Sequence, residues 1–476
     1  MPVGYGQAET RHNPIDNLEK SMGKKVQFTS RIGLIAATVG SAVGLGNIWR
    51  FPAEVQQGGG AAFLAIYVLC VIILGIPVML AEFTVGRAGR SDAIGAFRNL
   101  GAARPWWFAG MTGLLASYLI LCFYMVVAGW TLEYLWQSLT GDLYNTVAGT
   151  DSATQSFDAH MTEYIGTTWP PLISTFILIA VNLGVLLMGV QKGIERASNI
   201  LMPLLFAILV VFCCFSLTLP GASDGLHYFL NPDFSKVTTD VVLSALGQAF
   251  FSLSLGMGIL ITFASYYPRT ANLTRTAATV SALDLMVSLL MGFIIFPAVM
   301  TFGLDGESTA GATLVFVTLP EIFAQMPGTQ VWSSLFFVLL LVAALTSTIS
   351  ISEVSIKFMQ DRFGLTRTRA CMAVILPLFV FSTICSLSNG VLSDVRILGM
   401  NIFDLLDNFA TNILLPLTAI GTCLYVGWGA PEKLLWSQLT NDGTIRNRLY
   451  RPIRFTIRYI APILIGAVLV WYFIKG

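Results

Sequence analysis

One carboxylate stands where the sequence is otherwise apolar. Asp284 lies within residues 277–303, a run long and apolar enough to cross a membrane. An ionised group at that depth is costly unless it is paired, so an intramembrane acid indicates a functional site by default. Asn47 and Ser252 add side-chain oxygens from two other apolar segments. We expect these three residues to hold a hard cation, which prefers oxygen ligands, and a protonated or capped structural acid is the alternative.

A further pair of oxygens comes from Thr346 and Ser347, which are adjacent within the apolar run 339–351. Neighbouring hydroxyls in a span often bond to the carbonyl one helical turn back, and this local use explains the pair when it is taken alone. If nearby backbone carbonyls lack helical partners, the same hydroxyls can join those carbonyls in binding a cation.

Glycines interrupt two of the apolar segments. Gly40, Gly44 and Gly46 lie in the first, and Gly256 and Gly258 lie in the sixth. Glycine inside a helix costs about 1 kcal/mol relative to alanine, and unwound backbone at membrane depth is tolerated only where it is buried or lines a cavity. Gly40 and Gly44 also form a Gly-x-x-x-Gly motif, which is common at helix contacts. The matched pair of interrupted segments, running in opposite directions, instead predicts an inverted-repeat transporter.

Broken helices supply two kinds of ligand at once. The N-termini of half-helices present unpaired N–H groups that suit a carboxylate, and the freed carbonyls suit a cation. Two charges lie near the outer ends of these segments, because Arg50 ends the first and Asp407 begins the tenth. We expect them to pair across the mouth of a cavity for only about 0–1 kcal/mol, and two unpaired interfacial charges are the alternative.

The composition sets the class of protein. Of 476 residues, 55% are hydrophobic and 11% are charged, whereas about a quarter of a soluble chain is charged. This predicts an all-α integral membrane protein. The net charge of +1 argues against nucleic-acid binding. The three histidines lie outside the apolar runs and form no cluster with cysteines or acids, which argues against an enzyme.

We predict eleven transmembrane helices. The expected spans are residues 31–56, 60–84, 108–138, 170–190, 199–219, 241–266, 277–303, 331–359, 371–390, 401–428 and 455–474. They form a five-plus-five inverted repeat with helices 1 and 6 broken. The first repeat occupies 31–219 and the second 241–428, preceded by a cytoplasmic segment 1–30 and followed by a cytoplasmic loop and helix 11 in 429–476.

The basic residues set the expected orientation. If the N-terminus is cytoplasmic, all but four of the 27 basic residues lie on the inside. An odd number of spans then places the C-terminus outside, in the inner or plasma membrane of the cell. Residues 1–30 lack the short apolar core of a signal peptide, and the seven cysteines lack metal-ligand spacing, so we expect buried free thiols.

Three motifs resemble the neurotransmitter:sodium symporter family, in its bacterial amino acid branch. They are GSAVGLGN at residues 40–47, SLSLGMG at 252–258 and AALTS at 343–347, and the resemblance covers about residues 25–430. It implies a sodium-coupled symporter that imports a neutral hydrophobic or aromatic L-amino acid by alternating access. Its partners would be that amino acid, sodium ions and the bilayer. Two sodium sites are expected, and no chloride.

The resemblance also implies roles for individual residues. The sodium ions would be held by Gly40, Ala42, Val43, Asn47, Ser252, Asp284, Ala343, Thr346 and Ser347. The substrate would be bound by Ser41, Ala42, Gly44, Leu45, Gly46, Ile120, Tyr124, Phe251, Ser252, Ser254, Met257, Ser347 and Ile351. Tyr124 and Phe251 would close over it. The gates would be Arg50 with Asp407 outside and Lys25 with Asp361 inside.

Departures from the family pattern refine these expectations. Gly44 stands where monoamine carriers have an acid, so the substrate should bring its own carboxylate. Asp284 stands where many relatives have asparagine, and it would supply the charge that chloride supplies elsewhere. The residues that could still line an anion site are Tyr67, Gln248, Ser252 and Ser288. Lys25 replaces the usual arginine and is a weaker bidentate partner.

Two alternatives stay open at this point. One is a proton-coupled amino acid carrier on the same fold, with Asp284 as the titrating group, and equal uptake in sodium and potassium would favour it. The other is a non-transporting amino acid sensor, for which binding without uptake would be decisive.

Overall fold

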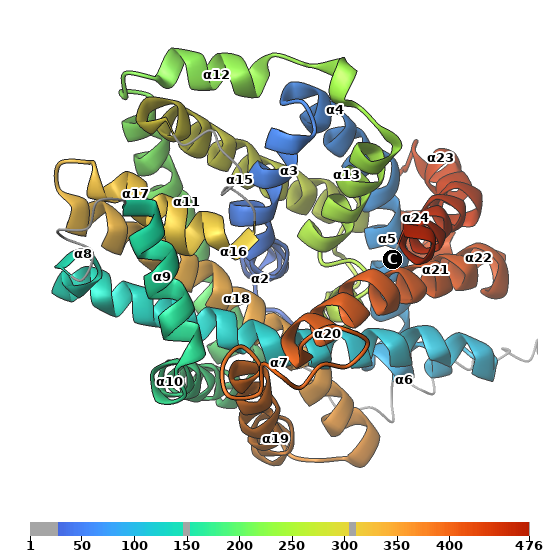
Figure 1. Cartoon of the computed structure of the whole chain (residues 1–476). Coiled ribbons are helices and arrows are strands. Elements are labelled where there is room, and N and C mark those ends of the chain that lie inside the picture. Colours follow the sequence, from blue (N-terminus) through green and yellow to red (C-terminus); the bar gives the residue numbers. More distant parts are fainter. Residues whose placement is uncertain (1–26, 146–152, 304–310, 476) are drawn as a thin grey trace, which may run out of the picture.

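The computed structural model describes residues 27–145, 153–303 and 311–475. Within these residues the chain is almost entirely helical and contains no β-strand, only two isolated bridges. The predicted all-α class is therefore confirmed. The helices form one bundle, with α2 and α3 near its middle (Figure 1).

The labels below follow the chain, and η marks 3-10 or π-helical turns. The first elements are α2 (Arg31–Ala42), η1 (Gly46–Arg50), α3 (Phe51–Gln57), α4 (Ala61–Cys70), η2 (Val71–Gly75), α5 (Ile76–Gly89), α6 (Ala93–Asn99), α7 (Arg104–Thr140) and α8 (Asp142–Asn145). The middle elements are α9 (Ala153–Gly166), α10 (Trp169–Leu187), η3 (Val190–Glu195), α11 (Arg196–Ser216), α12 (Ala222–Leu230), η4 (Phe234–Lys236), α13 (Thr239–Ser252), α14 (Ile259–Ser265) and α15 (Leu273–Phe302). The last elements are α16 (Gly311–Thr313), η5 (Leu314–Thr318), α17 (Leu319–Ala324), α18 (Thr329–Phe363), α19 (Arg367–Leu387), α20 (Ile402–Asn408), η6 (Phe409–Leu414), α21 (Leu415–Leu424), η7 (Tyr425–Gly429), α22 (Glu432–Thr440), α23 (Tyr450–Phe455), η8 (Thr456–Ile460) and α24 (Ala461–Lys475).

The first helix is broken where its glycines predicted. It ends as α2 at Ala42 and resumes at Gly46, and the two halves are bent by 55°. The N–H of Gly44 donates to Asn47 Oδ1 at 3.1 Å rather than to the carbonyl one turn back, so the Gly40 carbonyl lacks its helical partner. The break thus exposes backbone groups in the middle of the bundle.

The sixth helix is also broken. α13 ends at Ser252 and α14 begins at Ile259. Between them Ser254, Gly256 and Gly258 have φ of 53°, 78° and 70°, a region that favours glycine. Gly256 also needs to lack a side chain, because a Cβ there would lie 2.3 Å from the Leu415 carbonyl oxygen. The two predicted helix breaks are therefore confirmed.

The count of eleven spans stays a prediction. In the described residues nine helices are long and apolar enough to span a membrane, and the bent pair α2 with η1–α3 makes ten. The remaining predicted span corresponds to α13 and α14, whose 14 and 7 residues are each too short to cross alone. The division into two inverted repeats, 31–219 and 241–428, likewise stays a prediction.

The halves of the broken helices lie against the longest continuous ones. α2 packs against α11, α15 and α18, and α14 packs against α5 and α18, while α7 packs along α18 and α10. Elements α21 to α24 gather at one side of the bundle (Figure 1). Continuous helices thus form a frame around two interrupted ones. All seven cysteines are free, as predicted, but only four are buried, because Cys70 and Cys213 are half-buried and Cys214 is exposed on α11.

Candidate functional site

Asp284 lies at the centre of a buried polar cluster between the two breaks. Ser252 Oγ lies 2.8 Å from Asp284 Oδ1 and 2.7 Å from Oδ2, and Asn47 Nδ2 donates to Oδ1 at 2.8 Å. Asn47 Nδ2 also reaches Ser288 Oγ at 3.0 Å, and the Tyr67 hydroxyl lies 3.3 Å from Asp284 Oδ2. None of these side chains is more than 1% exposed. Three residues, Asn47 on η1, Tyr67 on α4 and Ser252 on α13, therefore converge on one carboxylate of α15, and Ser288 joins the cluster through Asn47.

This cluster lacks a positive charge. Asp284 forms no ion pair with any residue that the structure describes, although a buried carboxylate without a cation is unfavourable. The Asp284 carboxylate and the Ser252 and Tyr67 hydroxyls are oxygen ligands, and such ligands suit a small hard cation rather than a transition metal.

A second set of oxygens lies across α2 from the first. Ser347 Oγ donates to the Val43 carbonyl at 3.4 Å, which joins α18 to the first break. A Cβ on Gly40 would lie 3.3 Å from Thr346 Cβ, so Thr346 packs directly against α2. The Thr346 hydroxyl bonds to the Val342 and Ala343 carbonyls, both at 3.0 Å, which is the local use anticipated for it.

The break in the first helix forms a small polar pocket with α7 and α18. Leu45 N–H donates to the Tyr124 hydroxyl at 3.2 Å. A Cβ on Gly44 would lie 3.0 Å from Ser347 Oγ and 3.1 Å from the Tyr124 oxygen, so only glycine leaves this space open. A backbone N–H group at a helix break, a phenolic hydroxyl and a serine hydroxyl at one point can bind a carboxylate.

The second break closes the same region. Ser254 Oγ donates to the Ser41 carbonyl at 2.6 Å. The Phe251 ring lies so close to Gly46 that a Cβ there would be 2.6 Å from it. Other side chains predicted to line the substrate pocket are buried, and they are Ala42, Ile120, Met257 and Ile351; Ala343, predicted at a sodium site, is buried as well. The structure thus brings the two breaks together, while the substrate-contact roles of these residues stay predictions.

The predicted outer gate is not formed as an ion pair in this structure. Arg50 Nε lies 3.5 Å from Glu54 Oε1, one helical turn along, and no pair with Asp407 is present among the described residues. The Arg50 guanidinium lies over the Phe251 ring at 5.7 Å. Arg50 and Phe251 line one pocket of about 50 Å³ with Thr411, whose hydroxyl donates to the Asp407 carbonyl. The assignment to Asp407 overlooked Glu54, although an i, i+4 pair is visible in the sequence and competes with any distant partner.

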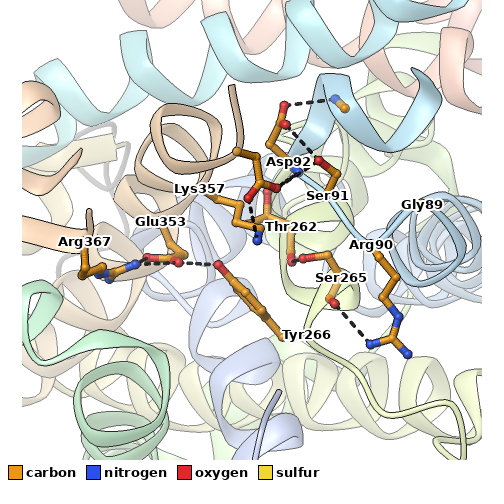
Figure 2. A network of polar contacts seen from close by, with 12 residues as sticks. Gly89, Arg90, Ser91, Asp92, Thr262, Ser265, Tyr266, Glu353, Lys357 and Arg367 are labelled. Atoms are coloured by element: carbon orange, nitrogen blue, oxygen red, sulfur yellow. Dashed lines mark hydrogen bonds and ion pairs between the residues drawn. The ribbon is translucent and has the colours of Figure 1, made fainter. Parts of the chain in front are cut away.

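At the opposite end, Asp361 has partners that the sequence did not indicate. Lys25, its predicted partner, lies outside the described residues. Lys357 Nζ lies 3.0 Å from Asp361 Oδ1, and Ser91 Oγ and Asp92 N–H donate to Oδ2 at 3.0 and 2.9 Å. Figure 2 shows Ser91, Asp92 and Lys357 converging there. Burial, aided by Asp361, raises the pKa of the Asp92 carboxyl above its ordinary value, so this carboxyl titrates at a higher pH than an exposed one.

A second polar group beside it was also missed. Glu353, for which the sequence suggested no role, is fully buried and pairs with Arg367 at 2.7 Å (Figure 2). The Tyr266 hydroxyl donates to its other oxygen at 2.6 Å. Because Tyr266 follows directly after α14, this network ties the second broken helix to α18 and α19.

Removal of Arg367 is expected to destabilise the fold. Arg367→Ala leaves the Glu353 charge buried without a partner, which costs roughly 3–5 kcal/mol. Arg454→Ala is the matched control, because Arg454 pairs at 2.5 Å with Glu432, which is 80% exposed, and an exposed pair contributes about 0–1 kcal/mol. Thermal unfolding of the two purified variants in detergent should show a clear loss for the first and almost none for the second. Equal losses would contradict this account.

Glu82 on α5 positions the second break. Its side chain is fully buried, and its Oε1 accepts from the Gly256 N–H at 2.7 Å. The break frees this N–H, and no other group in the described residues bonds to it. In the sequence, the only feature that singled out Glu82 was an acid inside an apolar run. Its partner is a backbone amide, which a sequence cannot identify.

Comparisons with known proteins agree with this architecture. The family model described as "Sodium:neurotransmitter symporter family" matches residues 25–164 and 159–476. An uncharacterized sodium-dependent transporter of Bacillus subtilis is 36% identical over 442 residues, which cover 93% of this chain and 96% of the relative. One of Methanocaldococcus jannaschii is 34% identical over 423 residues, covering 85% and 82%. The crystal structure of MhsT in complex with L-phenylalanine matches with a TM-score of 0.84 at 39% identity, covering 94% of this chain and 99% of that one.

Proposed function

Because the chain belongs to the sodium:neurotransmitter symporter family, we propose that it imports a neutral hydrophobic or aromatic L-amino acid together with sodium. Membership makes the protein a multi-pass membrane transporter rather than an enzyme. The proposal beyond this concerns its substrate, its ions and its cycle. The observation that carries it is the meeting of two broken helices around Asp284, a buried carboxylate that pairs with no cationic side chain in the part of the chain that the structure describes.

The substrate carboxylate binds at the first break in this proposal. Leu45 N–H donates to the Tyr124 hydroxyl at 3.2 Å, and that hydroxyl lies beside the space left by Gly44. No acid of the chain occupies position 44, so a substrate that carries its own carboxylate can complete the site. The apolar side chains Ile120, Met257 and Ile351 leave room for an apolar or aromatic side chain, and the structural relative MhsT was solved with L-phenylalanine.

Sodium is a co-substrate that binds at two places. Asp284, Asn47 and Ser252 form the first set of oxygens, beside the substrate carboxylate. The hydroxyls of Thr346 and Ser347 with the carbonyls of Gly40 and Val43 form the second. Both sets lie at the break that binds the substrate, the first through Asn47 and the second through the Gly40 and Val43 carbonyls, which gives a physical reason for coupling.

Chloride is not required in this proposal. Asp284 lies among Tyr67, Ser252 and Ser288, the residues that otherwise suit an anion. A fixed carboxylate within 3.3 Å of the Tyr67 hydroxyl would repel chloride from the same space.

The transport cycle is alternating access, with the N-terminus cytoplasmic and the protein in the inner or plasma membrane. Tyr124 and Phe251 close over the substrate. Arg50 and Asp407 flank the outer opening, and Asp361 lies at the inner one. Arg50 has an alternative partner in Glu54 at 3.5 Å. Exchange of Arg50 between Glu54 and Asp407 can therefore open and close the outer side at a small cost in free energy.

Uptake into proteoliposomes tests this function. Labelled L-leucine, L-tryptophan and L-alanine are offered under an inward sodium gradient or a potassium gradient, with gluconate as the anion. Sodium-dependent uptake in gluconate supports the proposal. If uptake appears only when chloride is added, Asp284 does not replace chloride. Equal uptake under the sodium and potassium gradients would favour the proton-coupled carrier. Binding of the amino acid without uptake would favour a sensor.

A further inference from the structure

A carboxylate from a distant part of the chain holds the start of α2. Glu195, at the junction of η3 and α11, accepts from the Thr29 N–H at 2.9 Å and the Thr29 hydroxyl at 2.7 Å. It also accepts from the Ser30 N–H and the Ser30 hydroxyl, both at 3.0 Å. Glu195 is 2% exposed and forms no ion pair within the described chain. Its charge is therefore balanced by these four donors and by the positive end of α2.

Glu195 also acts through the cap of the helix. Ser30 is the N-cap of α2, and its Oγ accepts from the Gly33 N–H at 2.8 Å. Because the Ser30 hydroxyl donates to Glu195, its lone pairs are turned toward Gly33. The carboxylate thus reaches groups that the first turn of a helix otherwise leaves without partners.

Gly33 makes this contact possible. A Cβ at this position would lie 2.2 Å from Glu195 Oε1 and 2.4 Å from its Cγ. Glycine is unfavourable inside a helix, and nothing in the backbone of α2 requires it here, since its φ is not positive. The room that it leaves is filled by Glu195.

Glu195 holds Thr29 and Ser30, and these two residues come directly before α2, which we treat as a unit that can move. α2 is 12 residues long, and the break at residues 43–45 separates it from η1 and α3 at an angle of 55°. The residues before α2 have two weaker ties, Phe28 N–H to the Tyr266 carbonyl at 3.2 Å and Gln191 Nε2 to the Gln27 carbonyl at 2.8 Å. The Glu195 bonds are the only charge-assisted ones among these, and such bonds are roughly twice as strong as neutral ones.

We propose that Glu195 is the positioning residue that keeps α2 closed against α11, and that loss of its four hydrogen bonds lets α2 move about the break. This inference rests on the proposed function, in which α2 lines the cytoplasmic side of an alternating-access carrier. Because α2 also carries the Gly40 carbonyl and ends beside Val43, its movement would loosen the second sodium site.

Hydrogen–deuterium exchange of the full-length protein in sodium tests the proposal. In Glu195→Ala, peptides covering residues 31–42 should exchange about tenfold faster than in the wild type, while α10 is unchanged. Glu195→Gln keeps one acceptor oxygen, so its exchange should fall between the two. Glu133→Gln is the matched control, because Glu133 on α7 bonds to Gln137 rather than to α2, and it should leave α2 unchanged.

A second variant distinguishes loss of the contact between Glu195 and the start of α2 from general destabilisation of the protein. Gly33→Ala forces a methyl group into the Glu195 side chain and should speed exchange in α2 about as much as Glu195→Ala does. In the Glu195→Ala background the space is vacant, so Gly33→Ala should add nothing. Unchanged exchange of α2 in Glu195→Ala, or additive effects of the two substitutions, would overturn the proposal. Failure of the wild type to transport would instead overturn the proposed function, since exchange is measured without transport.

Discussion

Asp284→Asn is expected to reduce sodium-driven amino acid uptake in chloride-free medium by at least about 100-fold. The substitution keeps the shape of the side chain and its contacts with Ser252 and Asn47, at 2.7 to 2.8 Å, but removes the only carboxylate of the buried cluster. Loss of a charged ligand in a dry site costs about 3 kcal/mol, and each 1.4 kcal/mol is about a factor of ten. Initial uptake rates at limiting sodium in proteoliposomes give the measurement.

Two controls accompany this variant. One is added chloride, and the other is substitution of Ser288, a neutral residue of the same cluster. Added chloride should restore part of the uptake in Asp284→Asn, because an anion can then enter the space beside Tyr67 and Ser288. Ser288→Ala removes one neutral contact of Asn47 and should cost less than about tenfold. Wild-type sodium dependence of Asp284→Asn in gluconate would show that the carboxylate does not serve as the fixed negative charge.

Tyr124→Phe is expected to raise the half-saturating amino acid concentration about 10- to 100-fold with a smaller change in maximal rate. The hydroxyl that it removes accepts from Leu45 N–H at 3.2 Å and faces the space above Gly44. A hydrogen bond to a charged group is worth about 1.5–3 kcal/mol, which corresponds to this range. Equilibrium binding of labelled L-phenylalanine in saturating sodium gives the measurement.

Tyr118→Phe is the matched control on the same helix. Its hydroxyl donates to the Val374 carbonyl at 3.1 Å, on the side of α7 that faces α19. It should therefore leave the affinity for substrate unchanged, although it also removes a phenolic hydroxyl from α7. Equal losses of affinity in both variants would mean that Tyr124 acts on the packing of α7 rather than on the substrate.

The interruptions of the fold were predictable because their cause is local. The glycines at residues 40–46 and 256–258 weaken a helix wherever it is placed, and both helices are broken there. The convergence of Asn47, Ser252 and Asp284 was also predicted, since an acid inside a membrane has to find polar partners. The sixth span was predicted as residues 241–266, and the six residues between α13 and α14 divide it into halves that are each too short to cross a membrane alone.

The partners of several charged residues were not predictable, because they are set by packing. Glu195 caps a helix that begins 165 residues earlier in the chain, and the partner of Glu82 is a backbone amide that only the break exposes. Arg50 is a different case, because it was assigned to Asp407 although Glu54, its partner in the structure, lies only one helical turn away in the sequence. Such partners depend on which helices are adjacent and on the conformation that the protein adopts.

The two breaks and the four-donor clamp at Glu195 suggest how binding and movement are connected. The first break contributes Leu45 N–H to the substrate pocket and the Val43 carbonyl to the second set of oxygens. The segment before it, α2, is held at its start by Glu195. Ligands at the break would fix one end of α2 while Glu195 fixes the other, so both ends would have to be released before α2 could move.

Accumulation of an amino acid against its own gradient tests the central claim most directly. Proteoliposomes are loaded with labelled L-phenylalanine at the same concentration inside and outside, in gluconate and at equal pH, so that a sodium gradient is the only source of free energy. The account predicts net influx when sodium is higher outside and net efflux when the gradient is reversed. No net movement in either direction, or movement that follows an imposed pH gradient instead of sodium, would contradict it.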